Sequence, residues 1–346
     1  MKKVHHFLLL FLSFSNIYGQ IGGKSAFQFL KFPVSARNEA LGGGVLSIKD
    51  NDISTVISNP SLIDSSLNKQ IVFSNSFFIE DVNIGNLAYV QYHKRIKSTL
   101  TYAVQYASYG KFERRDNAGN LLGEFRASDF NFQVGSSHYW QNLHYGINLK
   151  FIYSNLAQYN SLALATDIAL GYHNTEKKIS FSILLRNAGF QLKKYDKNGE
   201  REKLPLQADV SFSKKFTKLP VALIIVAHDL QTWKLSYPRQ QNNSNIFGQP
   251  SGKKKSDVVN NIFGHLIFGA EIDAGKPVRL RLGYNHLRRM ELANTQKKGL
   301  AGISAGIGLN IRQFSVDYGF GAYHAAGSDH FLTLRIKLDE FGKKAK

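Results

Sequence analysis

The chain contains no cysteine, and only 7 of its 346 residues are proline. The missing thiols exclude disulfide frameworks, cysteine nucleophiles and thiolate metal sites, and they fit an oxidising compartment. Acidic residues are scarce as well: 25 Asp and Glu stand against 44 Lys and Arg, which gives a formal net charge of +19. This excess predicts anionic partners such as nucleic acid, a membrane surface or an acidic glycan. No stretch reaches the roughly 20 apolar residues of a transmembrane helix.

The start of the chain has the pattern of a secretory signal peptide. Lys2 and Lys3 form a basic flank, an apolar run follows from Phe7, and Gly19 is a small residue suited to cleavage. We therefore expect residues 1–19 to be removed on export. A buried N-terminal helix is the alternative, but it does not account for the basic flank or the small residue where the apolar run stops. Export would exclude most nucleic-acid functions despite the charge.

Beyond residue 70, apolar and polar residues alternate with a period of two, as β-strands require. Near the C-terminus, for example, Leu332, Leu334 and Ile336 alternate with Thr333 and Arg335. A helix would instead place apolar residues at i, i+3 and i+4. The alternation predicts about fourteen strands, near 70–78, 84–93, 98–109, 125–139, 142–154, 160–173, 178–188, 205–216, 219–228, 262–272, 277–286, 299–310, 313–322 and 329–338.

The lengths of the connections distinguish a membrane barrel from a soluble sandwich or propeller. Long connections, such as 110–124 and 229–261, alternate with short ones, such as 140–141 and 217–218. Long outer loops and short periplasmic turns are typical of outer-membrane barrels. We therefore predict an all-β fold: an outer-membrane antiparallel β-barrel of about 14 strands over residues 70–346, with long outer loops.

Residues 20–69 lack this alternation. Several apolar residues between 27 and 48 nevertheless need burial, and a barrel of this size leaves room inside. We therefore predict an N-terminal plug, or hatch, in the lumen; a periplasmic tail is the alternative. Glycines would let the backbone pass close to the barrel wall, and an Asn-Pro pair would fix the turn into the first strand. These plug and turn residues are Gly42, Gly43, Gly44, Asn59 and Pro60.

No motif supports catalysis or metal binding. Ser66 with Lys69, and Ser211 with Lys214, have the Ser-x-x-Lys spacing of penicillin-binding proteins. That motif requires a helix and a downstream Lys-Thr-Gly strand, which is absent here. The histidines are scattered, with no His-Glu-x-x-His run. We therefore predict no catalytic residues, no cofactor and no metal site.

Charged residues within the strands are expected to pair inside the barrel. A charge on the lipid face costs about 2–4 kcal/mol at the membrane midplane, so the lumen is the favourable place for it. The acids in question are Asp167, Asp209, Glu271 and Asp317, and the bases available to them are Lys150, Arg186, Arg279, Arg281, Arg335 and Lys337.

The outer loops carry more cations than acids. The longest loop, from 240 to 260, combines Asn, Gln and Gly with a run of lysines, and loops of this length are usually functional or disordered. Solvation of the rim is one interpretation; contact with phosphate-rich lipopolysaccharide or an acidic partner is the other. The candidate contact residues are Lys253, Lys254, Lys255, Arg288 and Arg289.

Short motifs resemble the FadL-type transporter superfamily of outer-membrane barrels, which have fourteen strands and an N-terminal plug. They are Pro-Val-Ser-Ala-Arg at 33–37, Ala-Leu-Gly-Gly at 40–43, Asp-Asn-Asp-Ile-Ser at 50–54 and Ser-Asn-Pro-Ser-Leu at 58–62. Several segments more closely resemble the PorQ family of the type IX secretion system of Bacteroidota. They are residues 22–30, 33–37, 109–112, 148–154 and 186–189. The likeness extends over essentially the whole mature chain.

This resemblance implies a non-enzymatic role in type IX secretion. A PorQ-like barrel would hold a PorZ-like surface protein in a complex with PorU and PorV, which joins cargo to anionic lipopolysaccharide. The implied partners are therefore that complex, lipopolysaccharide and outer-membrane lipid, with no nucleic acid. A FadL-type importer of hydrophobic solutes is the alternative, and it needs a greasy lumen pocket. A barrel-borne hydrolase would need a Ser/His pair, and none is identified.

Overall fold

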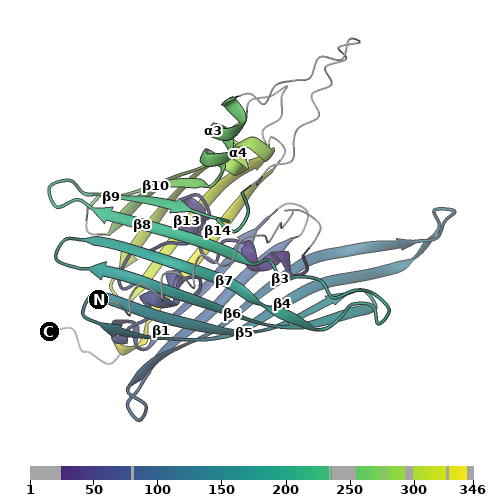
Figure 1. The fold of residues 1–346 in the computed structure, drawn as a ribbon, viewed down its shortest axis with the longest axis horizontal. Coiled ribbons are helices and arrows are strands. Elements are labelled where there is room, and N and C mark those ends of the chain that lie inside the picture. Colours follow the sequence, from purple (N-terminus) through teal and green to yellow (C-terminus); the bar gives the residue numbers. More distant parts are fainter. Residues whose placement is uncertain are drawn as a thin grey trace, which may run out of the picture.

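A computed structural model describes residues 25–78, 82–233, 235, 255–275, 277–292, 299–324 and 327–340. The expected signal peptide lies outside these residues. Within them, fourteen strands form one closed antiparallel barrel in which each strand pairs with its neighbours in sequence. The barrel closes where Gln70–Phe77 pairs with the last strand. Figure 1 shows the strands inclined along the barrel. The predicted all-β barrel of about 14 strands is confirmed.

The strand bounds agree with the predicted segments to within a few residues at most ends. The strands are β1 (Gln70–Phe77), β2 (Asn83–His93), β3 (Ser98–Arg115), β4 (Leu121–Trp140), β5 (Leu143–Leu156), β6 (Tyr159–Asn174), β7 (Ile179–Lys193), β8 (Gln207–Lys215), β9 (Val221–Ala227), β10 (Leu266–Asp273), β11 (Val278–Asn285), β12 (Ile303–Ile311), β13 (Phe314–His324) and β14 (Gly327–Lys337).

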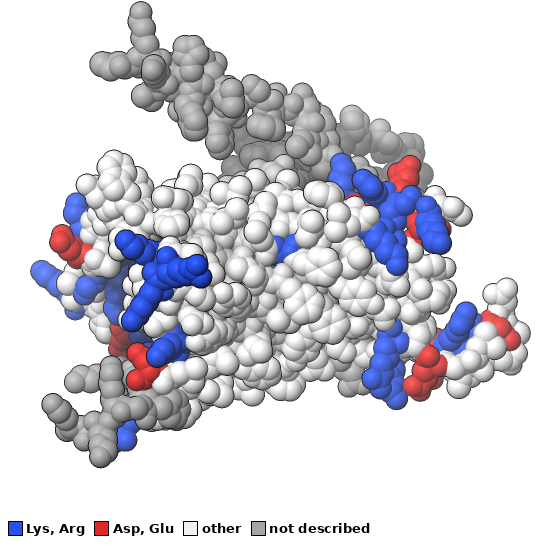
Figure 2. Space-filling model, turned by 90° about the horizontal axis from the view of Figure 1, so that it is seen from below, with Lys and Arg blue, Asp and Glu red and all other residues white. Residues whose placement is uncertain are grey.

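The alternation along each strand is reversed relative to a soluble protein. In β5, Leu149 and Phe151 face outward and are 60% and 42% exposed, whereas Asn148 and Lys150 face inward and are buried. Apolar side chains on the outside and polar side chains within are the pattern of a barrel surrounded by lipid. Figure 2 shows the consequence: a broad, largely uncharged face lies between two charged ends.

The wall is longest on one side. Strands β3 to β7 have 14 to 20 residues, whereas the other strands have 7 to 11. The connection expected at 110–124 is largely strand, because β3 and β4 continue to a tight turn at residues 116–120. There the Asp116 carboxylate accepts hydrogen bonds from the backbone N–H groups of Ala118 and Asn120 at 2.9 and 2.8 Å, an Asx-type turn that closes a hairpin.

Residues 25–69, here called the lumen segment, lie inside the barrel (Figure 1). The segment contains one short α-helix and four 3-10 turns: η1 (Gln28–Lys31), α2 (Ala36–Ala40), η2 (Ile53–Thr55), η3 (Pro60–Leu62) and η4 (Ser65–Leu67). Most of its apolar residues are buried, and Ile53, Leu62 and Phe29 are at most 3% exposed. They pack against inward-facing small or apolar residues of the wall, such as Val90 and Ala163.

Two helices stand at the outer end, where only loops were expected. The first, α3 (Lys255–Gly264), delays the start of β10 to Leu266, so the predicted strand at 262–272 begins four residues too early. The second, α4 (His286–Leu292), follows β11 directly, and the two helices pack together. No helix in the described ranges is long and apolar enough to cross a membrane.

Candidate functional site

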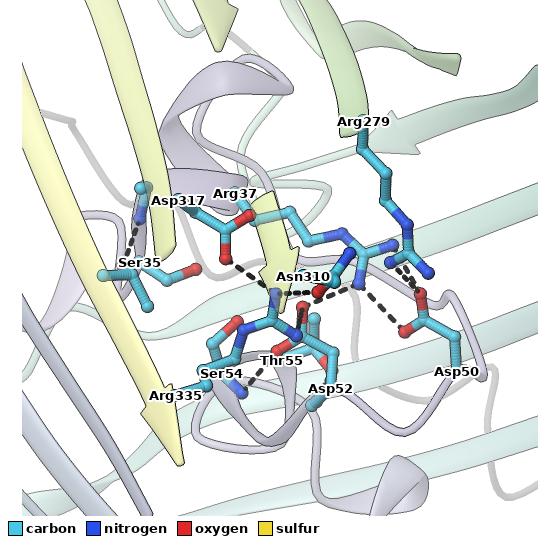
Figure 3. A network of polar contacts seen from close by, with 12 residues as sticks. Ser35, Arg37, Asp50, Asp52, Ser54, Thr55, Arg279, Asn310, Asp317 and Arg335 are labelled. Atoms are coloured by element: carbon cyan, nitrogen blue, oxygen red, sulfur yellow. Dashed lines mark hydrogen bonds and ion pairs between the residues drawn. The ribbon is translucent and has the colours of Figure 1, made fainter. Parts of the chain in front are cut away.

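The centre of the molecule is a cluster of buried charges that joins the lumen segment to the wall. Arg37 of α2 is fully buried. Its Nε and Nη2 donate to the two carboxylate oxygens of Glu271 in β10, at 3.0 and 2.8 Å. Its Nη1 donates to Asp52 at 2.8 Å, and its Nη2 donates to Asp50 at 2.7 Å. A single guanidinium therefore connects two parts of the lumen segment with the barrel. Figure 3 shows its contacts with Asp50 and Asp52.

The ion pairs close into a ring of alternating charges. From Arg37 the ring passes to Glu271 and then, through barrel ion pairs of 2.7, 2.6 and 2.8 Å, to Arg281 of β11, Asp317 of β13 and Arg335 of β14. Arg335 returns to Asp52 at 3.1 Å, and Asp52 pairs with Arg37. Figure 3 shows Arg335 between Asp317 and Asp52. Three cations and three anions compensate one another where no single charge could be left unpaired.

The ion pairs of the strand residues bear on the expectation that charges within the strands pair in the lumen. Glu271 and Asp317 pair with Arg281 as described, Lys150 pairs with Asp167 at 2.7 Å, and Arg186 pairs with Asp209 at 2.8 Å. That expectation is confirmed. The anchoring role of Arg37 was missed, because its partner Glu271 lies 234 residues away in sequence.

A second ion pair lies nearer the outer end. Arg288 of α4 is 8% exposed and donates through Nη1 to the Glu39 carboxylate at 2.6 Å and through Nη2 to the Tyr323 hydroxyl at 2.9 Å. Its guanidinium carbon also lies 4.0 Å from the centre of the Tyr323 ring. Burial lowers the pKa of Arg288, but Glu39, Tyr323 and Asp329 together outweigh burial and raise that pKa above its ordinary value. Arg288 therefore faces the interior and not the surface where the sequence placed it.

Two further candidate contact residues, Arg289 and Lys255, lie at the outer end. Arg289 is half-buried, and its Nη1 donates to the carbonyls of Gly299 and Ala301, so it holds the residues just before β12 in place. Lys255 is the first residue of α3. Lys253 and Lys254 lie outside the described residues, and their expected contact stays a prediction.

The glycines and the Asn-Pro pair lie where the lumen segment approaches the wall. Gly42 and Gly43 have φ of +95° and +84°, and a Cβ on Gly42 would lie 2.4 Å from Ile267 Cγ2. Gly44 is packed against Val226 and Ile267 of the wall. Gly42 and Gly43 therefore need the conformational freedom of glycine, and Gly42 and Gly44 need its small size.

Asn59 and Pro60 begin a 3-10 turn inside the barrel. The Asn59 side chain accepts from the Ser61 backbone N–H and donates to the Leu46 carbonyl and Ser182 Oγ, at 3.2, 3.0 and 3.2 Å. Pro60 is the first residue of η3, a favourable position for a residue with no N–H. The turn therefore connects two parts of the lumen segment with each other and with β7. Because η4 lies between this turn and β1, the Asn-Pro pair does not form the turn into the first strand that the sequence predicted.

A platform of exposed apolar side chains occupies the outer end beside β9 and β10. On α3, Val258 and Val259 are 56% and 51% exposed. Trp233, after β9, is 64% exposed, and its carbonyl accepts from the Asn261 side chain of α3. We call this surface the helical platform; its exposed apolar residues are Leu230, Trp233, Val258, Val259, Ile262, Phe263 and Leu300.

The described residues form no group of three or more His, Asp or Glu side chains arranged to hold a metal ion. The two Ser-x-x-Lys pairs are also unlike catalytic pairs. Ser211 points into the lumen toward Ser47 Oγ at 3.1 Å, whereas Lys214 donates to the carbonyl of Lys177 at the periplasmic edge. Ser66 is engaged with Asn51 and Asp64.

No family model matches the chain, and no curated protein matches it. Among solved structures, the toluene transporter TbuX of Ralstonia pickettii is similar with a TM-score of 0.53 and 9% identity, over 89% of this chain and 99% of that one. A Pseudomonas aeruginosa FadL homologue gives 0.48 and 9%, over 91% and 100%. A mutant of the monoaromatic hydrocarbon channel TodX gives 0.49 and 11%, over 88% and 98%.

At this identity the likeness to TbuX establishes the fold alone, the closed antiparallel barrel described above. The outward-facing apolar band agrees with it, since only lipid satisfies such a surface. The protein is an outer-membrane barrel.

Proposed function

We propose that this barrel is a non-enzymatic component of the type IX secretion system that docks the surface attachment complex. Its outer end would bind a PorZ-like surface protein, and through it PorU and PorV, so that secreted cargo is joined to anionic lipopolysaccharide. The proposal rests on the resemblance of the sequence motifs to the PorQ family and on two features of the geometry, a clamped lumen and an apolar outer platform.

The clamped lumen segment is the observation that carries a docking role. Glu271 of β10 holds Arg37, and Arg288 of α4 holds Glu39, so two ion pairs anchor α2 to neighbouring parts of the barrel. Moving the segment aside would leave several charges buried without partners, which is costly. A rigid, filled barrel suits a scaffold better than a conduit.

The helical platform supplies the surface for the partner. Exposed apolar groups gathered on the side of a protein that faces the medium mark interaction sites. Aromatic residues such as Trp233 and Phe263 are typical of the centres of protein interfaces. Lys253 and Lys254, which precede α3 in sequence, and Lys255 at its first position would add contacts with acidic groups of the partner or with lipopolysaccharide phosphates.

The first experiment is deletion of the gene, followed by localisation of cargo. A docking role predicts that cargo crosses the membrane but is not attached to the surface. The second experiment compares Val259→Asp/Ile262→Asp on the platform with Leu121→Asp/Leu122→Asp at the tip of the β3–β4 hairpin, where the two leucines are 60% and 61% exposed. Only the platform variant is expected to lose co-purification of the surface partner. Normal cargo attachment in the deletion strain, or equal partner retention in both variants, would contradict the proposal.

Import of a hydrophobic solute is the second candidate, and the fold of TbuX, described as a toluene transporter, favours it. An importer needs an apolar pocket inside the barrel. The apolar hollow formed by the described residues instead lies on the outer wall, where side chains such as Phe132 and Leu149 face outward. Uptake of labelled toluene or fatty acid by cells that carry or lack the gene separates the candidates, because only an importer changes the uptake rate.

A further inference from the structure

The lipid-facing wall is hollowed over strands β1 to β7. A trough of about 890 Å³ crosses these strands, and its lining is almost wholly apolar. Phe132, Phe151, Leu164 and Phe190 form one row of it, and each is directly opposite the next in the strand pairing. All four are between 41% and 57% exposed. The trough therefore follows a line of neighbouring residues around the wall.

The row from Phe132 to Phe190 lies at the level of the outer leaflet. Phe132 is eight residues from Trp140, and Leu164 is eight residues from Tyr172, the aromatic residues near the periplasmic ends of β4 and β6. Eight strand residues measure about 26 Å and rise roughly 20 Å at a tilt near 40°. The apolar band of such barrels is about 25 Å tall, so the row from Phe132 to Phe190 lies in its outer half. The part of the trough over β1 to β3, at Ile71, Tyr89 and Tyr102, lies nearer the periplasmic ends of those strands.

Three exposed cations stand above the trough on the strands that line it. They are Lys111 of β3, Arg126 of β4 and Lys193 of β7. Lys111 is directly opposite Arg126 and contacts the Glu124 carboxylate at 3.3 Å; both of those side chains are 57% exposed. The Lys193 ammonium donates to the Asn160 side chain.

The height of these cations matches that of lipid phosphates. Asn160 is twelve residues from Tyr172 along β6, which corresponds to a rise of roughly 30 Å and places Lys193 just above the apolar band. Figure 2 shows charged side chains gathered at both ends of the uncharged face. An apolar trough below and cations above complement a lipid with several acyl chains and phosphate groups.

We propose that the trough and its cationic rim bind one molecule of the acylated, phosphorylated glycolipid of the outer leaflet. Its acyl chains lie against the row from Phe132 to Phe190, and its phosphates lie between Lys193 and the Lys111–Arg126 pair. Charge-assisted contacts to phosphate are strong and directional. A phospholipid of the surrounding membrane has fewer chains and phosphates with which to fill this site.

The test measures lipid retained by the whole barrel. The protein is extracted from outer membranes in mild detergent, and glycolipid per barrel is measured by native mass spectrometry. The rim variant Lys111→Gln/Arg126→Gln/Lys193→Gln and the trough variant Phe132→Ala/Phe151→Ala are each expected to retain about tenfold less glycolipid than the wild type, the change that about 1.4 kcal/mol produces.

Two matched controls remove the same groups elsewhere. Lys94→Gln/Lys97→Gln neutralises exposed cations between β2 and β3 at the periplasmic end, and Ile307→Ala/Leu309→Ala truncates outward-facing residues of β12 on the other side of the barrel. Both are expected to retain wild-type glycolipid. Heat-modifiable migration, the change in electrophoretic mobility when a folded barrel is boiled, verifies that every variant is folded.

Several results would overturn the proposal. If all folded variants retain equal amounts of glycolipid, the lipid is bound nonspecifically. Recovery of phospholipid alone with the wild-type barrel would lead to the same conclusion. Displacement of the bound lipid by millimolar inorganic phosphate would indicate a simple anion site without a role for the trough. A photo-crosslinker at Leu164 that captured a protein, and no glycolipid, would show that a membrane partner fills the trough. None of these measurements depends on secretion, so they stand apart from the docking role.

Discussion

Arg37 and Glu271 form a two-pronged ion pair, with Nη2–Oε1 and Nε–Oε2 distances of 2.8 and 3.0 Å, although 234 residues separate them. One belongs to the lumen segment and the other to β10 of the wall. Parallel N–H···O bonds of this kind fix geometry as well as supplying energy. The pair therefore fixes where α2 lies inside the barrel.

Loss of this pair is expected to release the lumen segment. Arg37→Met would remove one of the arginines that compensate the buried carboxylates of Glu271 and Asp52. Removing one partner of a buried ion pair costs about 3–5 kcal/mol of folding free energy. We expect faster cleavage of residues 25–69 by a protease added to purified barrels, while the strands stay protected. The control, Arg115→Met, removes an exposed pair with Glu113 worth about 0–1 kcal/mol. Equal cleavage of the two variants would contradict the anchoring role.

Acid is expected to loosen the same segment. Burial disfavours the charged form of Asp52, but Arg335 and Arg37 outweigh burial and hold the pKa of Asp52 below its ordinary value. Because the pKa of Asp52 is lower in the folded protein than in the unfolded chain, this carboxylate stabilises the folded state. The stabilisation is complete above the pKa of an unfolded Asp, about 3.9, and is lost as the pH falls from there toward the pKa of the folded state. Cleavage of the segment by an acid-active protease should therefore accelerate below about pH 4.

The Asp52→Asn variant provides the control for acid release. It lacks the titrating carboxylate, so its segment should be less firmly held at neutral pH and should change less between pH 5 and pH 3 than the wild type. An identical pH profile in wild type and variant would show that other groups govern the acid response.

The backbone of η3 approaches β5 closely at Gly146, which makes this glycine sensitive to substitution. A Cβ at this position in β5 would lie 2.4 Å from the carbonyl carbon and oxygen of Pro60 in η3. Gly146→Ala is therefore expected to displace η3 and to lower the temperature at which the folded band disappears in a heat-modifiability series. Gly199→Ala is the matched control, since its nearest neighbours lie at 3.5 and 3.6 Å. Unchanged temperatures for both variants would mean that the turn yields at little cost.

Local patterns were sufficient to predict the barrel. Alternation with a period of two is visible within each strand, and the lipid face excludes charge, so the placement of the strand charges in the lumen followed from a physical rule. Which base pairs with which acid, as Lys150 does with Asp167 and Arg186 with Asp209, was not predicted. The hairpin beyond residue 110 was missed because its charged residues do not alternate with apolar ones.

The site could be predicted only in part, because its central contacts join distant segments. Nothing near Arg37 in sequence indicates Glu271 or Arg335 as partners. The helix α3 did leave a signal: Val258, Val259, Ile262 and Phe263 recur with helical spacing, but the length of the connection led to a prediction of loop. Arg288 was assigned to the surface because charge in an outer connection is usually solvated, whereas Glu39 pairs with it inside.

Arg288 and the lysines at 253–255 are expected to respond oppositely to neutralisation. Arg288→Gln would leave the Glu39 carboxylate buried without its cation, so the folded barrel should be destabilised and the partner lost only as a consequence. Lys253→Gln/Lys254→Gln/Lys255→Gln should leave the heat-modifiable band unchanged and weaken partner binding. Because exposed charges are screened within about 8 Å at physiological salt, wild-type binding should also weaken as salt rises, and less so in the triple variant. If the Arg288→Gln barrel is stable but fails to bind its partner, Arg288 contacts the partner directly, and the structural role assigned to it here is wrong.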